Sequence, residues 1–195
     1  MASAELAAQD RLPLPPEREL SAAQRAAEER ISVGPRGGIF GPFVPLLRSP
    51  EMMTRLQLVG EYIRFESLLD DDLVELVILM VARHWDQQFE WGHHHPIALE
   101  KGLSPETVEC VANRRRPASG RDEVGVVWDL VDELQRTRQV SDQVYAAAVE
   151  ALGEEGVVEV VGTTGYYTTL AMVMNTARTP PPPDAPRLPR GEKEN

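Results

Sequence analysis

LVELVILMVARHWDQQFEWGHHHPIALEKG, residues 73–102, is the stretch that decides how this chain folds. Its first half is apolar on nearly every side of a helix, which is typical of a helix buried at the centre of a domain. The part from residue 84 onward contains all four histidines of the chain, His84 and His93–His95, beside Trp85 and Trp91. Such a cluster indicates a metal site, an acid–base catalytic site, or a helix that is merely rich in polar aromatic residues.

The segments on either side of this stretch are also predicted to be helices. Residues 49–51 and 104–106 both read Ser-Pro-Glu, which places a capping serine, a first-turn proline and an acid at the start of a helix. A single apolar stripe at three- and four-residue steps follows, formed by Val124, Val127, Trp128, Val131 and Leu134. A further helix is expected to begin at the Ser-Asp pair 141–142 and to end at Gly153.

The last apolar segment, residues 154–177, is compatible with two structures. Its Val, Thr and Tyr residues favour a strand, whereas its length and its lack of internal turns favour a helix. Taken with the other segments, it leads us to expect an all-α domain of about seven helices without a sheet.

The composition shifts at both ends of the chain. Residues 1–17 mix Ala, Pro and charged residues, and residues 179–195 carry a proline run that excludes helix and sheet alike. We therefore expect a single domain at 18–178 between a disordered or arm-like N-terminal tail and a Pro-rich C-terminal tail, and both tails are candidates to lie on a neighbouring subunit. Residues 32–49 are rich in Gly and Pro yet carry apolar side chains, so this loop is expected to pack down on the domain.

Length and charge narrow the function classes. The 195 residues are enough for one domain with its own core, and the net charge of −11 argues against nucleic-acid binding, which depends on Lys and Arg. The sequence shows neither a secretory signal nor an apolar run of about 20 residues, so we expect a cytoplasmic protein without a membrane partner. The lone cysteine, Cys110, excludes an internal disulfide and is expected to be a small, partly buried hydrophobe in a helix.

Helical geometry brings part of the histidine-rich segment onto one face. With Asp86 as the N-cap, Gln87, Glu90 and His94 fall within about 60° of one another, at 100° per residue. Trp91 lies beside them, whereas His93 and His95 point elsewhere, so the triple histidine is not a ready-made three-ligand face.

Two further residues in this region raise specific expectations. Pro96 would clash with the Gly92 carbonyl in a continuous helix and would push His95 away from helical angles, so we expect a kink or break there. Glu75 lies within the apolar helix and needs a partner if it is buried, such as a histidine or glutamine of the next helix. Alternatively, Glu75 simply favours the first turns of its helix.

Three short patterns resemble a known family. FEWxxH at 89–94, PIA at 96–98 and GLS at 102–104 resemble the cysteine-free members of the carboxymuconolactone decarboxylase-like superfamily, which includes alkylhydroperoxidase AhpD-type proteins. The segments GPFVPLLRSPEM and GYYTTLAMVMNTA are similar to the same subgroup, and the resemblance covers roughly residues 35–178. It implies an AhpD-like helical fold, a homotrimer or homohexamer, and a link to decarboxylation of lactone acids.

The peroxidase branch of that family carries Glu-x11-Cys-x2-Cys-x3-His. On this sequence the Glu falls on Glu75 and the His on His94, while the cysteine positions hold Gln87 and Glu90. The resemblance therefore implies that thiol peroxidase activity is absent and that the four polar side chains share one pocket.

The favoured hypothesis is an acid–base lyase that needs no cofactor and acts on a small carboxylated, lactone-like acid by decarboxylation or isomerisation. In it His94 moves the proton, Glu90 is its partner or the base, and Glu75 orients His94. The residues expected to contact the substrate are Gln87, Trp91, Tyr166 and Tyr167.

Two alternatives stay open. Glu75, Glu90 and His94, with His93 or His95, offer ligand types that suit Zn or Fe, which would make this a metal-dependent enzyme. Alternatively, the cluster is a buried polar network in a non-catalytic helical oligomer that binds a small molecule.

Overall fold

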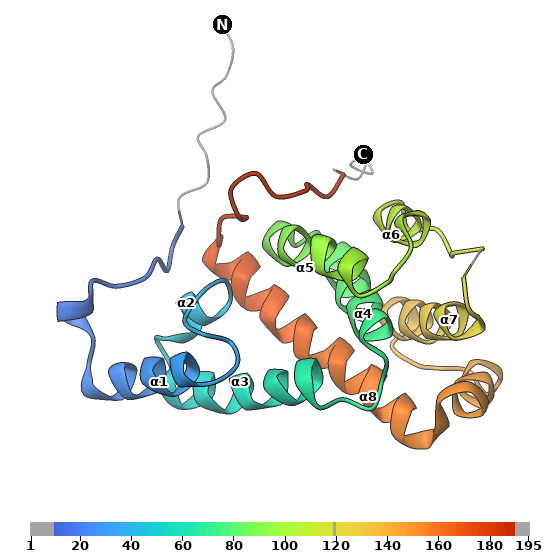
Figure 1. Cartoon of the computed structure of the whole chain (residues 1–195), viewed down its shortest axis with the longest axis horizontal. Coiled ribbons are helices and arrows are strands. Elements are labelled where there is room, and N and C mark those ends of the chain that lie inside the picture. The colour runs from blue at the N-terminus through green and yellow to red at the C-terminus, as the bar shows by residue number, and fades with distance from the viewer. Residues whose placement is uncertain (1–9, 119, 190–195) are drawn as a thin grey trace, which may run out of the picture.

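Helix α4 (Asp71–His84) lies at the centre of the molecule, as its apolar sequence predicts (Figure 1). In this computed structural model, which describes residues 10–118 and 120–189, every α4 residue from Leu73 to Arg83 is buried. Around α4 pack α5 (Gln88–Glu100), α6 (Pro105–Ala112), α7 (Asp122–Thr137) and α8 (Asp142–Ala177). The acids at its start, Asp71 and Asp72, stabilise the helix by facing the positive end of its dipole.

Three helices precede α4, and each start follows from the local sequence. Helix α1 (Ala22–Val33) begins with a capping box in which Ser21 and Gln24 satisfy each other's backbone N–H groups. Helix α3 (Pro50–Phe65) begins with the expected proline in its first turn. Between them the Gly/Pro-rich segment contains the short helix α2 (Phe43–Leu46), and its apolar side chains are buried as expected.

The ambiguous last segment is helical. It forms the larger part of α8, a helix that crosses the whole molecule and packs against α4, α7 and α3 (Figure 1). Helical geometry is interrupted only at Gly153, where φ is 73° and ψ is 167°, so the predicted helix end at this glycine is found as a break within α8. Burial in the core decides between strand and helix here, because one face of the segment packs along its length against other helices.

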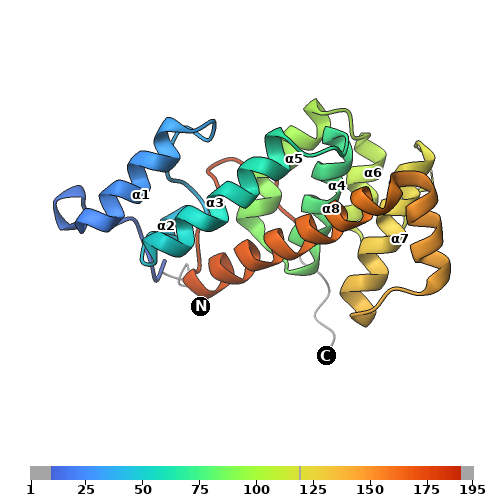
Figure 2. The same ribbon diagram turned by 90° about the horizontal axis from the view of Figure 1, so that it is seen from below.

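The all-α prediction is confirmed: the described residues form eight α-helices rather than about seven, and one short 3-10 helix at Glu17–Glu19. Residues 10–118 and 120–189 contain no strand. From below, α3 and α8 lie side by side across one face of the molecule (Figure 2). In the part of the chain described, no helix combines the length and the apolar character that crossing a membrane requires.

The described portions of both predicted tails contact the helical domain of their own chain. Arg11 donates from its backbone N–H to the Ala177 carbonyl over 2.8 Å. Residues 180–189, which we call the C-terminal strap, lie on α5: Leu188 is buried, and its backbone exchanges hydrogen bonds of 3.1 and 3.2 Å with the Gln88 side chain. The remaining tail residues, 1–9 and 190–195, lie outside the described residues.

Candidate functional site

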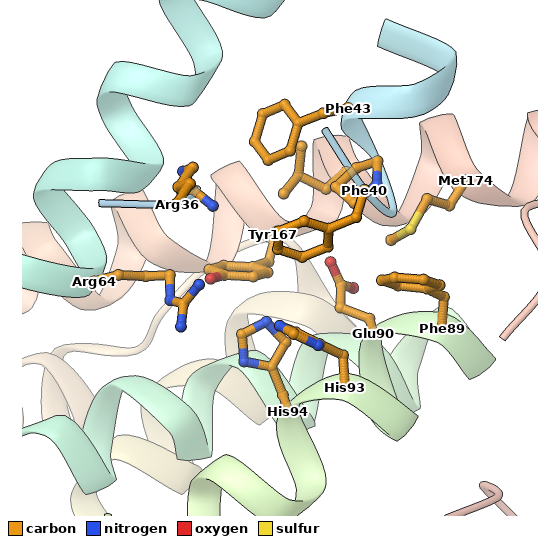
Figure 3. A pocket seen from close by; sticks show the side chains of 12 residues that line it. Arg36, Phe40, Phe43, Arg64, Phe89, Glu90, His93, His94, Tyr167 and Met174 are labelled. Atoms are coloured by element: carbon orange, nitrogen blue, oxygen red, sulfur yellow. The ribbon is translucent and has the colours of Figure 1, made fainter. Parts of the chain in front are cut away.

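A small cavity lies where α5, α8, the end of α3 and the loop at residues 34–42 meet (Figure 3). Its volume is about 20 Å³, which is room for one water molecule. The polar side chains in its wall are Arg36, Arg64, Glu90, His93, His94 and Tyr167. Aromatic and aliphatic side chains complete it, among them Phe40, Phe89 and Met174. The cavity therefore encloses several ionisable groups in apolar surroundings.

His94 and Glu75 form a buried pair beside this cavity. Nδ1 of His94 lies 2.8 Å from Oε2 of Glu75, and both side chains are 6% exposed. A carboxylate at this distance accepts a hydrogen bond from Nδ1–H, which leaves Nε2 of the imidazole free to accept a proton. Glu75 thus has the histidine partner that its burial required, and it reaches the site through His94.

Glu90 is buried without any such partner. Glu90 is 2% exposed, and neither of its carboxyl oxygens makes a hydrogen bond to the described residues. Burial raises the pKa of Glu90 well above its ordinary value, because the charged form would lose its hydration. Burial therefore favours the protonated form of Glu90, which can donate a proton.

The start of α5 differs from the prediction. Gln87, not Asp86, is the N-cap, and its Oε1 accepts hydrogen bonds from the backbone N–H groups of Phe89 and Glu90. Asp86 instead adopts a positive φ of 47° in the preceding turn. Nε2 of Gln87 donates to Asn175 over 2.9 Å, so both ends of this amide are engaged away from the cavity wall.

The prediction of a helix break at Pro96 is also wrong. α5 continues from Gln88 to Glu100 with Pro96 inside it, and His95 remains helical. Packing against α4 and α6 holds the helix together although the proline cannot donate a hydrogen bond.

The other histidines occupy different environments. His93 lines the cavity, and burial together with the nearby His94, Arg64 and Arg36 lowers its pKa to about 4, so the ring is neutral at physiological pH. The His95 ring packs against Trp91, with ring centroids 5.6 Å apart. His84 lies at the other end of α4, beside a separate hollow with Trp128.

Of the aromatic residues expected to contact a substrate, the structure places only Tyr167 in the cavity wall. Its ring meets that of His94 edge to face at 5.4 Å, and burial raises the pKa of its hydroxyl well above the ordinary value, which keeps it a hydrogen-bond donor. Trp91 is buried in the core, and Tyr166 lies against Gly60 of α3.

Arg36 and Arg64 are cavity residues that the sequence reasoning missed. Arg36 lies in the glycine-rich loop, where the pattern indicated apolar anchors, and Arg64 is in the last turn of α3, where a basic residue simply suits the helix dipole. Neither position carries a motif that would have singled it out.

The geometry does not favour the metal alternative. Within residues 10–118 and 120–189, no group of three or more His, Cys, Asp or Glu side chains is arranged to hold a metal ion. Glu75 is engaged with His94, while Glu90 stands apart from that pair.

Comparison with known proteins agrees with this architecture. The model of the Carboxymuconolactone decarboxylase family matches residues 50–133, which contain Glu75, Glu90 and His94. Among curated proteins none matches the chain.

Two solved structures share the fold. The AhpD core of an uncharacterised peroxidase-related protein from Ralstonia eutropha JMP134 superposes with a TM-score of 0.72 at 15% identity, over 89% of this chain and 93% of that chain. A protein of unknown function from Agrobacterium tumefaciens, an AhpD candidate in antioxidant defence, gives a TM-score of 0.63 at 16% identity, over 70% and 94%. The family match over residues 50–133 and the AhpD-like helical fold therefore confirm that this chain resembles the carboxymuconolactone decarboxylase-like superfamily.

Proposed function

We propose that this chain is an acid–base enzyme, a lyase or isomerase that acts on a small carboxylated, lactone-like acid. One observation carries the proposal: a histidine oriented by a buried carboxyl group and a second, protonated carboxyl group face one enclosed cavity. Two carboxyl groups in such different environments are suited to different proton-transfer roles.

Each residue then has a defined role. In a decarboxylation the bond between the α-carbon and the carboxylate breaks, CO₂ leaves, and the electron pair remains as an enolate conjugated with the neighbouring carbonyl. The Glu90 O–H protonates that carbon, and Glu90 recovers a proton from solvent, so one proton is taken up for each CO₂ released. In an isomerisation, Nε2 of His94 removes a proton and Glu90 returns one elsewhere. The Tyr167 hydroxyl is placed to donate a hydrogen bond to the enolate oxygen.

Thiol peroxidase chemistry is not part of the proposal. The residues at the two cysteine positions of the peroxidase pattern are Gln87 and Glu90, and neither can form a disulfide. Cys110 lies on α6 and does not line the cavity.

A substrate requires more room than 20 Å³, and two features of the wall supply it. The loop at 34–42 contains Gly37, Gly38 and Gly41 at positive φ, and it supplies Arg36 and Phe40 to the wall. Arg64 also borders a second hollow of about 270 Å³, which it shares with Glu75. Movement of this loop or of the Arg64 side chain would enlarge the site.

The first test is kinetic and needs no knowledge of the natural substrate. A panel of carboxylated lactones and 3-oxo acids is incubated with the protein in D₂O, and NMR follows deuterium entry at carbon and loss of CO₂. We expect turnover by the wild type and a 10²- to 10⁴-fold loss of kcat in Glu90→Gln, which keeps the shape but removes the acid proton. The matched control is Glu150→Gln, an exposed position on α8.

Glu90→Gln turning over every responsive compound as fast as the wild type would refute the catalytic role. A panel that binds but never reacts with the wild type would favour the non-catalytic small-molecule binder.

We also propose that the enzyme works as a homo-oligomer, a trimer or hexamer as the family resemblance implies. In support, large apolar side chains are exposed on the side-by-side helices α3 and α8 (Figure 2). They border a groove of about 370 Å³ that contains Val59, Tyr62 and Val158. A second copy of this chain is the partner that such a face would bury.

A further inference from the structure

We infer that Arg36 and Arg64 together bind the carboxylate group of the ligand, and that Gly60 is the residue that allows Arg36 to reach this position. The inference rests on the proposed function for the class of ligand, an organic acid. The two arginines belong to different elements, the 34–42 loop and α3, yet they line one cavity.

Both guanidinium groups lie at the same end of this cavity. Figure 3 shows them near the hydroxyl of Tyr167. The electrostatics agree, because both positive charges act on the Tyr167 hydroxyl and on His93. We call this pair of arginines, Arg36 and Arg64, the clamp. The clamp therefore lies next to the residues that are proposed to transfer protons.

The structure provides neither arginine with an acidic partner. Among residues 10–118 and 120–189, Arg36 and Arg64 form no ion pair, whereas arginines such as Arg116 and Arg121 are paired with aspartates. Nε and Nη2 of Arg36 are buried without an acceptor, and the guanidinium lies 4.9 Å from the centroid of the Phe43 ring. Buried donors without acceptors are costly, and an oxyanion between two guanidinium groups would satisfy them with charge-assisted hydrogen bonds.

Gly60 leaves the space on α3 that the end of the Arg36 side chain occupies. A Cβ atom at this position would lie 2.3 Å from Nη2 of Arg36 and 2.1 Å from the Tyr166 hydroxyl oxygen. A larger residue at position 60 would therefore displace the Arg36 guanidinium from its present position on α3. Because Gly60 and Arg64 are four residues apart on α3, they share a face, so Arg36 is held about one turn from Arg64. Two guanidinium groups in this arrangement repel each other until an anion binds between them.

The nearby acids Glu90 and Glu75 do not serve as the anion between the two guanidinium groups. Burial favours the neutral, protonated form of Glu90, and Glu75 is bonded to His94. The clamp is therefore specific for a charged group that the ligand brings, and it selects an acid over its neutral amide or ester.

Binding measured without turnover tests the inference. Isothermal titration with 5-oxotetrahydrofuran-2-carboxylate and with its neutral amide is carried out on full-length wild type and variants at fixed ionic strength. We expect the acid to bind at least tenfold more tightly than the amide. Arg36→Gln and Arg64→Gln should each remove most of that preference, Arg36→Lys should restore part of it, and the exposed control Arg55→Gln should keep it. Circular dichroism checks that each variant is folded.

The decisive arm combines Gly60→Ala with Arg36→Gln. If Gly60 acts only by admitting Arg36, Gly60→Ala weakens acid binding at least fivefold in the wild type and less than twofold in Arg36→Gln. An equal loss in both backgrounds overturns the role of Gly60. Equal affinity of the wild type for acid and amide overturns the clamp.

Two further arms separate this inference from its alternatives. Inorganic phosphate that competes as strongly as the carboxylate would overturn the ligand class, because it would show a general oxyanion site. In Glu90→Gln the acid should still bind within threefold of wild type. A protein that keeps this preference but never reacts with the panel would refute the proposed catalysis and leave the clamp in place.

Discussion

At the scale of single residues, the two buried acids of the site differ in how far the sequence predicts them. Glu75 lies in an apolar helix, so its need for a partner follows from its neighbours, and the structure supplies His94 at 2.8 Å. The same reasoning placed Gln87 with Glu90 on one face, but it could not show that Gln87 would cap α5 and that Glu90 would be left without a partner. Capping depends on the turn at Asp86, which has a positive φ and whose carboxylate accepts a hydrogen bond from the distant Arg114.

Because Glu90 is buried without a hydrogen-bond partner, we expect the free energy of unfolding of the protein to depend on pH. The native state keeps the Glu90 proton to higher pH than the unfolded chain, whose carboxyl group titrates near 4.5. Stability from this group is fully present below that value and is lost as the pH rises toward the native pKa. Glu90→Gln has no such proton, so its free energy of unfolding relative to wild type should rise by about 1.4 kcal/mol per pH unit above 4.5.

Urea unfolding of both proteins at pH 5, 6 and 7, at one protein concentration, measures this difference. A difference that stays constant over the three pH values would show that Glu90 is ionised in the native state.

At the scale of elements, helix starts were the most predictable feature and the behaviour within helices the least. The Ser-Pro-Glu patterns mark the starts of α3 and α6, because a first-turn proline acts locally in both helices. The Ser104 side chain also caps α6, whereas the Ser49 side chain makes no capping hydrogen bond at α3. The identity of residues 154–177 as helix, and the continuity of α5 through Pro96, were not decided locally. Both depend on the packing of the segment against α4, which a propensity cannot report.

Pro96 consequently destabilises α5 locally, and packing against neighbouring helices keeps the helix continuous. Pro96→Ala removes the clash with the preceding turn and adds an N–H that can donate to the Gly92 carbonyl. We expect a gain of about 1–2 kcal/mol in the free energy of unfolding. This gain is smaller than the cost of about 3 kcal/mol for a proline inside a helix, because the alanine leaves the unfolded chain freer and this offsets part of it. Thermal unfolding should then shift upward by about 2–8 °C.

The exposed substitution Glu100→Ala on the same helix serves as the control and should change the midpoint little. A lower midpoint for Pro96→Ala would mean that the proline itself contributes to packing at this position.

At the scale of the whole molecule, the charge of −11 coexists with an apolar face on α3 and α8. The sequence could not locate that face, because apolar residues occupy both the buried three- and four-residue steps of α8 and exposed positions such as Val158, Val161 and Met172. Val158 is 68% exposed at its groove, which makes it a direct probe of the proposed oligomer.

We expect Val158→Glu to dissociate the oligomer, because burial of an unpaired carboxylate at an interface is costly. Light scattering coupled to size exclusion should give three or six times 21.7 kDa for the wild type and 21.7 kDa for the variant. Ala151→Glu, an exposed position elsewhere on α8, should keep the wild-type mass. A wild type that elutes as a monomer would refute the oligomer.

The C-terminal strap can cover α5 only after it has been translated, which is well after α5 itself. Gly92 lies so close beneath it that a Cβ atom there would approach that of Ala185 to 2.8 Å. Roughly 80 residues separate the end of α5 from the strap, and a ribosome adds about 5–20 residues per second. This side of α5 consequently stays uncovered for several seconds, until the strap that covers it has been translated.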